Sequence, residues 1–295
     1  MANAPYTAGR WKKILACGRS VEASLERSGV LLTMGGEPTF VPSSPDGAEW
    51  LTDALGPTKL GYARRLGHEL VRTAFPGAVL LETSGKLYPS EPLPRWALLI
   101  QWLADGSPIW RDLRRLRADG QSGANAPGTC GTFIVSLARA LALDPARVLP
   151  LAEAHEPNET LGFVLPLDHD GAKWITDDWA PYLGTGPVVL VDGDSVAGLR
   201  LPLGELGDDS VRRALTAEVR DGALTIFVPP LLLADYVALL SAIESTLERL
   251  DLGDVVLAGY APPPDPALPT VGLASDPGVL EVNLSPCATW AEYDA

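Results

Sequence analysis

The sequence of 295 residues holds few of the side chains that build disulfide frameworks or soft metal sites: it has three cysteines and three histidines, all far apart. An odd number of widely spaced cysteines fits neither a disulfide scaffold nor a zinc-binding spacing, and it is typical of a reducing compartment. The N-terminus has no apolar core followed by a small-residue cleavage site. We therefore expect a cytoplasmic protein without a signal peptide.

Positive charge is also scarce: the chain has 23 Lys and Arg but 37 Asp and Glu, which gives a formal net charge of −14. Binding to nucleic acid or to an anionic membrane needs clustered cations, so neither is an expected partner. Long apolar runs of the length that crosses a bilayer are absent. The hydrophobic content of 46% and the charged content of 20% are instead typical of a soluble globular protein.

What is present is a mixture of helical and strand patterns. Apolar spacing predicts helices over 11–28, 57–74, 132–143 and 231–250, and strands over 30–34, 79–81, 255–258 and 278–284. Asp-Gly pairs at 105–106, 192–193 and 221–222 predict tight hairpin turns. The order of elements is not a regular alternation of strand and helix. We expect an α+β fold with a mostly antiparallel sheet and packed helices: a helical segment at 1–29, then one domain over 30–295.

Two expected strands carry a carboxylate opposite an apolar face. Strand periodicity places Glu281 and Asn283 opposite Leu280 and Val282, and it places Glu218 opposite the apolar face of ALTAEVR. Glu37, beside a Gly-Gly pair, is a third candidate. If the three converge, their oxygens suit Mg²⁺ or Mn²⁺ and a nucleotide phosphate. The alternative is that each glutamate simply faces solvent, as is common in antiparallel sheets.

The loop 85–96, GKLYPSEPLPRW, is stiffened by three prolines and carries Lys86, Glu91 and Arg95. Its two cations could grip phosphate or carboxylate, with Arg as a bidentate fork, or the loop could be a structural connector. Arg200 is either a ligand-facing cation on a strand or an edge-strand charge that discourages aggregation. Cys130 is better explained as a small buried cysteine than as a nucleophile.

Eight blocks of sequence, taken in order, resemble one bacterial family. They are GGEPTFV (35–41), DGAEW (46–50), LGPTK (55–59), GKLYPSEPLPRWAL (85–98), GLRLPL (198–203), EVRDGALTIFVPP (218–230), GYAPPPDP (259–266) and DPGVLEVNLSP (276–286). The set resembles the amidoligase family DUF2126, which is commonly fused to transglutaminase-like domains. The resemblance covers roughly residues 30–292 and is weak over 112–180.

The resemblance implies a glutamine synthetase-like carboxylate–amine ligase fold in which ATP and Mg²⁺ (or Mn²⁺) bind on an antiparallel sheet. It implies metal ligation by Glu37, Glu218 and Glu281, with Asn283 beside the last as a cofactor contact. It also implies that Lys86, Arg95 and Arg200 are catalytic cations, of which Lys86 and Arg95 bind the cofactor phosphates. The substrate would be a small molecule or peptide that offers a carboxylate and an amine.

The sequence departs from the family in two places. Leu87 and Ser90 stand where the family usually has Trp and Gly, and the chain ends at Ala295, 14 residues after Glu281. The family continues there into a glycine-rich segment that ends in Asn-His. We therefore expect weak ATP turnover by this chain alone and association with another copy or with a partner chain carrying that segment.

Two other functions stay open at this stage. One is an inactive or split ligase that acts as a binding or assembly subunit. The other is a hydrolase that uses the same carboxylates. Transglutaminase-like and ATP-grasp proteins are further candidate partners.

Overall fold

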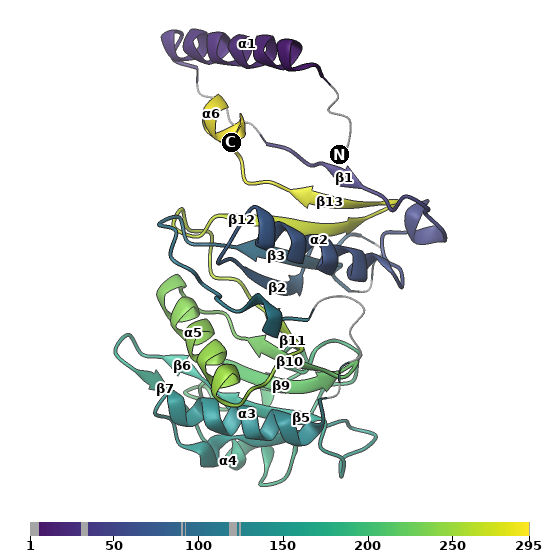
Figure 1. The fold of residues 1–295 in the computed structure, drawn as a ribbon. Coiled ribbons are helices and arrows are strands. Elements are labelled where there is room, and N and C mark those ends of the chain that lie inside the picture. Colours follow the sequence, from purple (N-terminus) through teal and green to yellow (C-terminus); the bar gives the residue numbers. More distant parts are fainter. Residues whose placement is uncertain are drawn as a thin grey trace.

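The computed structural model describes residues 6–30, 35–89, 91, 93–117, 123 and 125–294. An eleven-stranded sheet runs through these residues (Figure 1). Its order is β1 (Thr39–Phe40), β13 (Val279–Asn283), β12 (Thr270–Asp276), β3 (Trp96–Gln101), β2 (Val79–Ser84), β11 (Val255–Gly259), β10 (Ala223–Val228), β9 (Ala214–Arg220), β5 (Gly162–Pro166), β4 (Leu149–Ala152) and β8 (Val188–Val189). A separate hairpin joins β6 (Asp168–His169) to β7 (Trp174–Ile175).

Most neighbouring strands are antiparallel, and β11 is the main exception because it runs parallel to both β2 and β10. The helices are α1 (Ala8–Arg27), α2 (Lys59–Thr73), α3 (Pro127–Ala140), α4 (Ala180–Leu183), α5 (Leu233–Arg249) and α6 (Trp290–Asp294). The expected α+β class with a mostly antiparallel sheet is therefore confirmed. Among the described helices, none combines the length and the apolar character needed to cross a membrane.

The two faces of the sheet are covered by different helices. Gly67 lets α2 pack closely on Leu80 and Leu98, and we call this side the α2 face. The strand pairings from β3 to β9 place Phe227 and Glu218 on the same face of the sheet as Leu98. The opposite side, the α5 face, is covered by α3 and α5 over β9, β10 and β11, where its side chains are buried except for the partly buried Val219.

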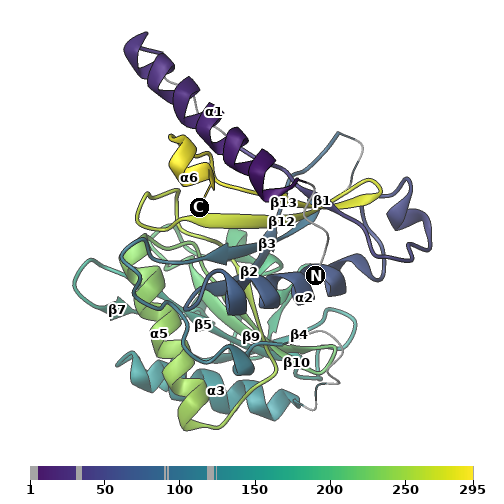
Figure 2. The ribbon, with the colours of Figure 1, turned by 45° about the horizontal axis from the view of Figure 1, so that its top comes forward.

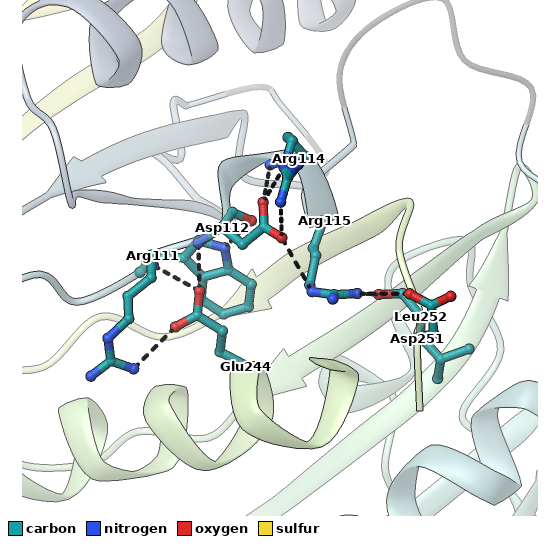
Figure 3. A network of polar contacts seen from close by, with 8 residues as sticks. Arg111, Asp112, Arg114, Arg115, Glu244, Asp251 and Leu252 are labelled. Carbon is teal, nitrogen blue, oxygen red and sulfur yellow. Dashed lines mark hydrogen bonds and ion pairs between the residues drawn. The ribbon is translucent and has the colours of Figure 1, made fainter. Parts of the chain in front are cut away.

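A buried carboxylate fixes α5 to the loop that precedes α3 (Figure 3). Glu244 of α5 is 4% exposed, and one of its oxygens accepts the backbone N–H groups of Arg111 and Asp112 at 2.7 Å each. Asp112 in turn pairs with Arg114 and Arg115. These contacts satisfy polar groups that would otherwise be buried without partners, and they hold the loop on the helix.

Of the three predicted hairpin turns, only the one at Asp221-Gly222 forms. Asp221 and Gly222 have φ values of 49° and 74° and join β9 to β10 in the expected hairpin. The hairpin expected at 105–106 is wrong, because residues 107–112 form no strand and the N–H groups of Ile109 and Trp110 bond instead to Gly77. The hairpin expected at 192–193 is also wrong, because residues 198–203 form no strand and lie in and around the 3₁₀ turn η4 (Ala197–Leu199). Of the strand expected over 30–34, residues 31–34 lie outside the described residues.

Candidate functional site

Glu37, Glu281 and Asn283 lie together at the β1 edge of the sheet, on its α5 face. Thr39 of β1 pairs with Glu281, and the N–H groups of Val282 and Leu284 bond to Pro38 and Gly36 in the same register. Glu37 therefore lies opposite Asn283, and Glu281 is its diagonal neighbour. Such cross-strand side chains lie within reach of one another.

Charged neighbours surround Glu281. Partial burial raises the pKa of Glu281, and the negative charges of Asp276 and Glu37 raise it further. The positive charge of Lys86 and a hydrogen bond from Asn283 oppose that rise in the pKa. We call Glu37, Glu281, Asn283, Asp276 and Lys86 the edge cluster. It gathers more negative than positive charge on a surface that is half open to solvent.

The floor beside the edge cluster is made of small residues. Ala274 pairs with Glu281 and Gly272 pairs with Asn283. On the next strand, Ala97 pairs with Ala274. All three are only partly buried. No bulky side chain rises from these positions, so a ligand held by the carboxylates could lie directly on the sheet.

Arg95 anchors the loop 85–96 beneath this cluster. Its guanidinium is 9% exposed, donates to both carboxylate oxygens of Glu91, and donates to Asp276 Oδ1 at 2.7 Å. It also stacks over the ring of Tyr88, with 4.0 Å from Cζ to the ring centroid. Arg95 therefore positions Asp276 and Glu91, and most of its donors are already used. Ser90 of the same loop lies outside the described residues.

Lys59 supports the same corner from α2. Its side chain is fully buried, and Nζ donates to the carbonyl oxygens of Asp276, Ala54 and Asp53 at 2.8, 2.9 and 3.2 Å. A buried ammonium is retained only when its donors are satisfied in this way. Lys59 thus fixes the end of β12 that presents Asp276. No sequence pattern marks Lys59 for this role.

Glu218 and Arg200 belong to a second group of charges under residues 190–203. Glu218 is 1% exposed, and Oε1 accepts the Ala197 N–H at 2.7 Å. Burial raises its pKa, and Oε2 has no hydrogen-bond partner within the described part of the chain. The nearest charged neighbour is Arg220, at 3.8 Å.

Arg200 completes this group. It is 6% exposed, forms a two-pronged ion pair with Glu153, and donates through Nε to the Val191 carbonyl at 2.8 Å. It caps η4 and does not lie on a strand as expected. We call Glu218, Arg220, Arg200 and Glu153 the β9 cluster. Its charges are mostly buried and paired with one another.

The structure does not bring Glu218 together with Glu37 and Glu281. Between β13 and β9 lie β12, β3, β2, β11 and β10, and the register places Glu218 on the α2 face while Glu281 is on the α5 face. Arg200 is with Glu218, whereas Lys86 and Arg95 are with Glu281. Across the described ranges, no three His, Cys, Asp or Glu side chains are placed to hold a metal ion together.

A groove of about 480 Å³ on the α2 face contains residues that sequence reasoning missed. Arg64 of α2 and Glu82 of β2 form a two-pronged ion pair in it. Phe227 and Tyr260 meet edge to face at 5.7 Å on its wall. Gly259, at φ 124°, sets the bend before Tyr260, and a Cβ there would strike the Val228 backbone. Arg64 and Glu82 come from separate elements, so no sequence spacing signals the pair.

Cys130 is fully buried in α3, and burial raises the pKa of its thiol to about 12. It is therefore a buried cysteine and a poor nucleophile at neutral pH.

The chain was also compared with known proteins. A family model described as "Putative amidoligase enzyme (DUF2126)" matches residues 2–157 and 204–295. No curated protein matches the chain, and no solved structure matches it. The matched residues include the whole edge cluster and, from the β9 cluster, Glu153, Glu218 and Arg220.

Proposed function

Since this chain belongs to the DUF2126 family of putative amidoligase enzymes, we propose that it is an ATP- and Mg²⁺-dependent carboxylate–amine ligase with the edge cluster as its reaction centre. In the proposed reaction the substrate carboxylate takes the γ-phosphoryl group of ATP and releases ADP. A substrate amine then attacks the acyl phosphate, so that an amide bond forms and phosphate leaves. The family assignment supports a ligase-like role in general, and the edge cluster supports the finer proposal.

The observation that carries the proposal is the position of Glu37, just before β1, opposite Asn283 and diagonal to Glu281 of β13. Two carboxylates and one amide oxygen are a suitable donor set for Mg²⁺, which usually keeps waters and takes its remaining ligands from phosphate oxygens. The like-charge repulsion that raises the pKa of Glu281 is relieved when a cation binds. The residues present therefore fit the metal.

Each remaining residue of the edge cluster has a role in this proposal. Bound Mg²⁺ supplies neutralisation of phosphate charge. Lys86 is exposed beside Glu281 and contributes a mobile positive charge to the phosphate oxygens. Arg95 holds Asp276 and Glu91 in place and so positions the loop that carries Lys86. Glu218 and Arg200 hold residues 190–203 on the sheet and take no part in metal binding.

The test is calorimetric titration of Mn²⁺, and of ATP with and without Mg²⁺, into the wild type and three single variants. We expect Glu37→Gln and Glu281→Gln to weaken Mn²⁺ binding by at least about tenfold, because loss of groups that only support metal ligands already costs that much. Glu218→Gln is the matched control, since it makes the same change in the β9 cluster, and its Mn²⁺ affinity should equal that of the wild type.

Unchanged Mn²⁺ affinity in both edge variants, or an equal loss in Glu218→Gln, would show that the metal site is placed wrongly. A second measurement follows ADP release from Mg·ATP with a mixture of amino acids and acidic peptides. Amine-dependent release supports the ligase. Tight Mg·ATP binding without any amine-dependent release would point instead to a binding subunit.

A further inference from the structure

A hollow of about 960 Å³ lies beside the edge cluster on the α5 face of the sheet. Gln101 of β3 and Thr270 of β12, which pair with each other, form its floor together with Leu99. One wall is the proline-rich loop 261–269. The other is the segment 285–292, which runs from the end of β13 into α6 (Figures 1 and 2). Hollows of this size hold ligands as large as a drug molecule.

The floor of the hollow continues the floor of the edge cluster. On the α5 face, β12 presents Ala274 beside Glu281, then Gly272 beside Asn283, and then Thr270. The first two lie in the edge cluster and the third lies in the hollow. From Ala274 to Thr270 the strand rises by about 13 Å, at roughly 3.3 Å per residue. One extended ligand can therefore lie on both floors.

Both walls are held in place by contacts within the chain. Five prolines restrict the backbone of the loop 261–269, and the Trp102 N–H donates to the Pro269 carbonyl oxygen. On the other side, Ser285 Oγ donates to the Thr270 carbonyl oxygen at 2.7 Å. A hollow that is already formed loses little conformational entropy when a ligand binds.

The lining of the hollow is apolar except for two acidic side chains. Trp102, Leu268 and the prolines supply the apolar surface, and Asp265 and Glu292 are the charged residues in the described part of the lining. Asp265 uses one oxygen to accept the Ala267 N–H, and Glu292 uses one for the N–H groups just before α6. Both side chains are exposed, and each has a second oxygen to offer to an ammonium group.

We propose that the hollow binds the carboxylate substrate of the ligase and that this substrate is a short, extended peptide. Its C-terminal carboxylate lies at the edge cluster, and its apolar side chains lie against Trp102 and the prolines. Its N-terminal ammonium lies against the acidic side chains of Asp265 and Glu292. This orientation rests on the proposed function, in which a substrate carboxylate is phosphorylated at the edge cluster.

The length of the shared floor favours a peptide over a single amino acid. A free amino acid carries its carboxylate and its ammonium on one carbon, whereas about 13 Å of strand separates Ala274 from Thr270. An extended chain spans about 3.3–3.6 Å per residue, so a tetrapeptide covers this distance. The charges of the walls also exclude a phosphorylated or acidic N-terminal residue, which the two carboxylates would repel.

The first test measures binding to the hollow alone, by calorimetry in metal-free buffer at physiological ionic strength. The probe is Leu-Ala-Leu-Ala with an amidated C-terminus, so that no carboxylate meets the edge cluster without its metal. We expect this probe to bind. Acetylation of its N-terminus should weaken binding about tenfold, because the ammonium loses two exposed ion pairs worth up to about fivefold each. Leucinamide, a single residue, should also bind at least about tenfold more weakly, because it buries less apolar surface.

Substitutions in the walls then locate the ammonium. Asp265→Asn and Glu292→Gln should each weaken binding of the amidated probe about threefold and leave the acetylated probe unaffected. Asp170→Asn is the matched control for Asp265→Asn. Asp170 is also exposed and accepts the N–H of the residue two positions later, but it lies in the turn between β6 and β7. Its variant should bind both probes as the wild type does.

The proposal is overturned if the amidated probe does not bind, if the acetylated probe or leucinamide binds equally well, or if Asp170→Asn loses as much affinity as Asp265→Asn. Mn²⁺ titration of Asp265→Asn keeps this result separate from the metal site, and the Mn²⁺ affinity should equal that of the wild type. A chain that binds the peptide but no Mn²⁺ would keep the peptide site and lose the ligase. A chain that binds Mn²⁺ but no peptide would keep the metal site and lose the peptide substrate.

Discussion

The edge cluster and the β9 cluster begin from the same sequence pattern and end in different surroundings. In each, a glutamate lies on a strand whose alternate residues are apolar. Residues around η4 cover Glu218, which has two arginines nearby. Glu281 is half open and faces Glu37 and Asp276. Burial is the main cause of the raised pKa of both glutamates, but only Glu281 is pushed further by two acidic neighbours.

The difference shows that the alternating pattern of a strand determines on which side a carboxylate lies. The pattern does not determine which other residues cover that side. A covered carboxylate needs internal partners and becomes part of the fold. An uncovered pair of carboxylates keeps its repulsion and is stabilised by an added cation. The comparison therefore favours a structural role for the β9 cluster, and it leaves the edge cluster as the site of ligand binding in the proposed function.

The largest expected effect comes from removing Arg200 from the β9 cluster. Arg200→Ala leaves Glu153 without its ion-pair partner and takes a positive charge away from Glu218. Breaking a buried ion pair from one side costs about 3–5 kcal/mol. We expect a loss of that size in the free energy of unfolding, measured by urea titration.

The control for this loss is Arg114→Ala, which removes an arginine whose side chain is 90% exposed. Exposed ion pairs contribute about 0–1 kcal/mol, so this variant should unfold almost as the wild type does. Equal stability of the two variants would mean that the β9 cluster is not structural.

Arg95→Lys should have an intermediate effect. It tests whether the loop 85–96 contributes both to stability and to ligand binding. Lysine keeps the positive charge but lacks the guanidinium group, which donates to Glu91 and to Asp276 at the same time. Hydrogen bonds to charged groups contribute about 1.5–3 kcal/mol, so we expect a loss of about 2 kcal/mol in urea titration.

The same variant should bind Mg·ATP more weakly in calorimetry, because the loop would no longer hold Lys86 over the edge cluster. Arg111→Lys, at a side chain that is 63% exposed, is the control for both measurements. A destabilised Arg95→Lys that binds Mg·ATP like the wild type would leave Arg95 with a purely structural role.

The smallest effect is a pH dependence that should differ between the clusters. A carboxyl whose pKa is raised on folding binds more protons folded than unfolded, so stability falls as pH rises from the unfolded pKa, about 4.3, through the folded one. Glu218→Gln and Glu281→Gln remove that fall. In thermal unfolding between about pH 4 and pH 8, each should gain stability over the wild type as pH rises.

Saturating Mg²⁺ distinguishes the two glutamates in the same experiment. It should cancel the advantage of Glu281→Gln, because the metal stabilises the wild-type carboxylates, and leave the advantage of Glu218→Gln unchanged. Equal responses to Mg²⁺ would remove the distinction between the clusters.

Local patterns predicted much of the fold because they act within one element. The longest amphipathic run, expected over 231–250, is α5 at Leu233–Arg249, and the strand expected over 278–284 is β13. Asp221-Gly222 made its hairpin because two strands with matching apolar faces flank it. Asp105-Gly106 failed because Trp110, after the turn, is buried in the core beside Gly77 and does not continue a strand.

The candidate site was only half predictable for a related reason. Strand parity correctly placed Glu281 and Asn283 on one side of β13 and Glu218 opposite the apolar residues of β9. Whether those two sides form one face depends on the register of every strand between them, and on β11 joining β2 and β10 in parallel. That information lies in pairings between distant segments. The Arg64–Glu82 pair and the role of Lys59 were missed for the same reason.

The parallel pairing of β2 with β11 also has a consequence for how the chain acquires its fold. Glu82 has Ala258 as its neighbour, and β3 pairs with β12 only slightly further along the chain. The middle of the sheet therefore waits for segments that are synthesised long after β2 and β3, and closing such long loops is slow. Until then β2 and β3 form a hairpin with two unpaired edges, which makes the nascent chain prone to association with other strands.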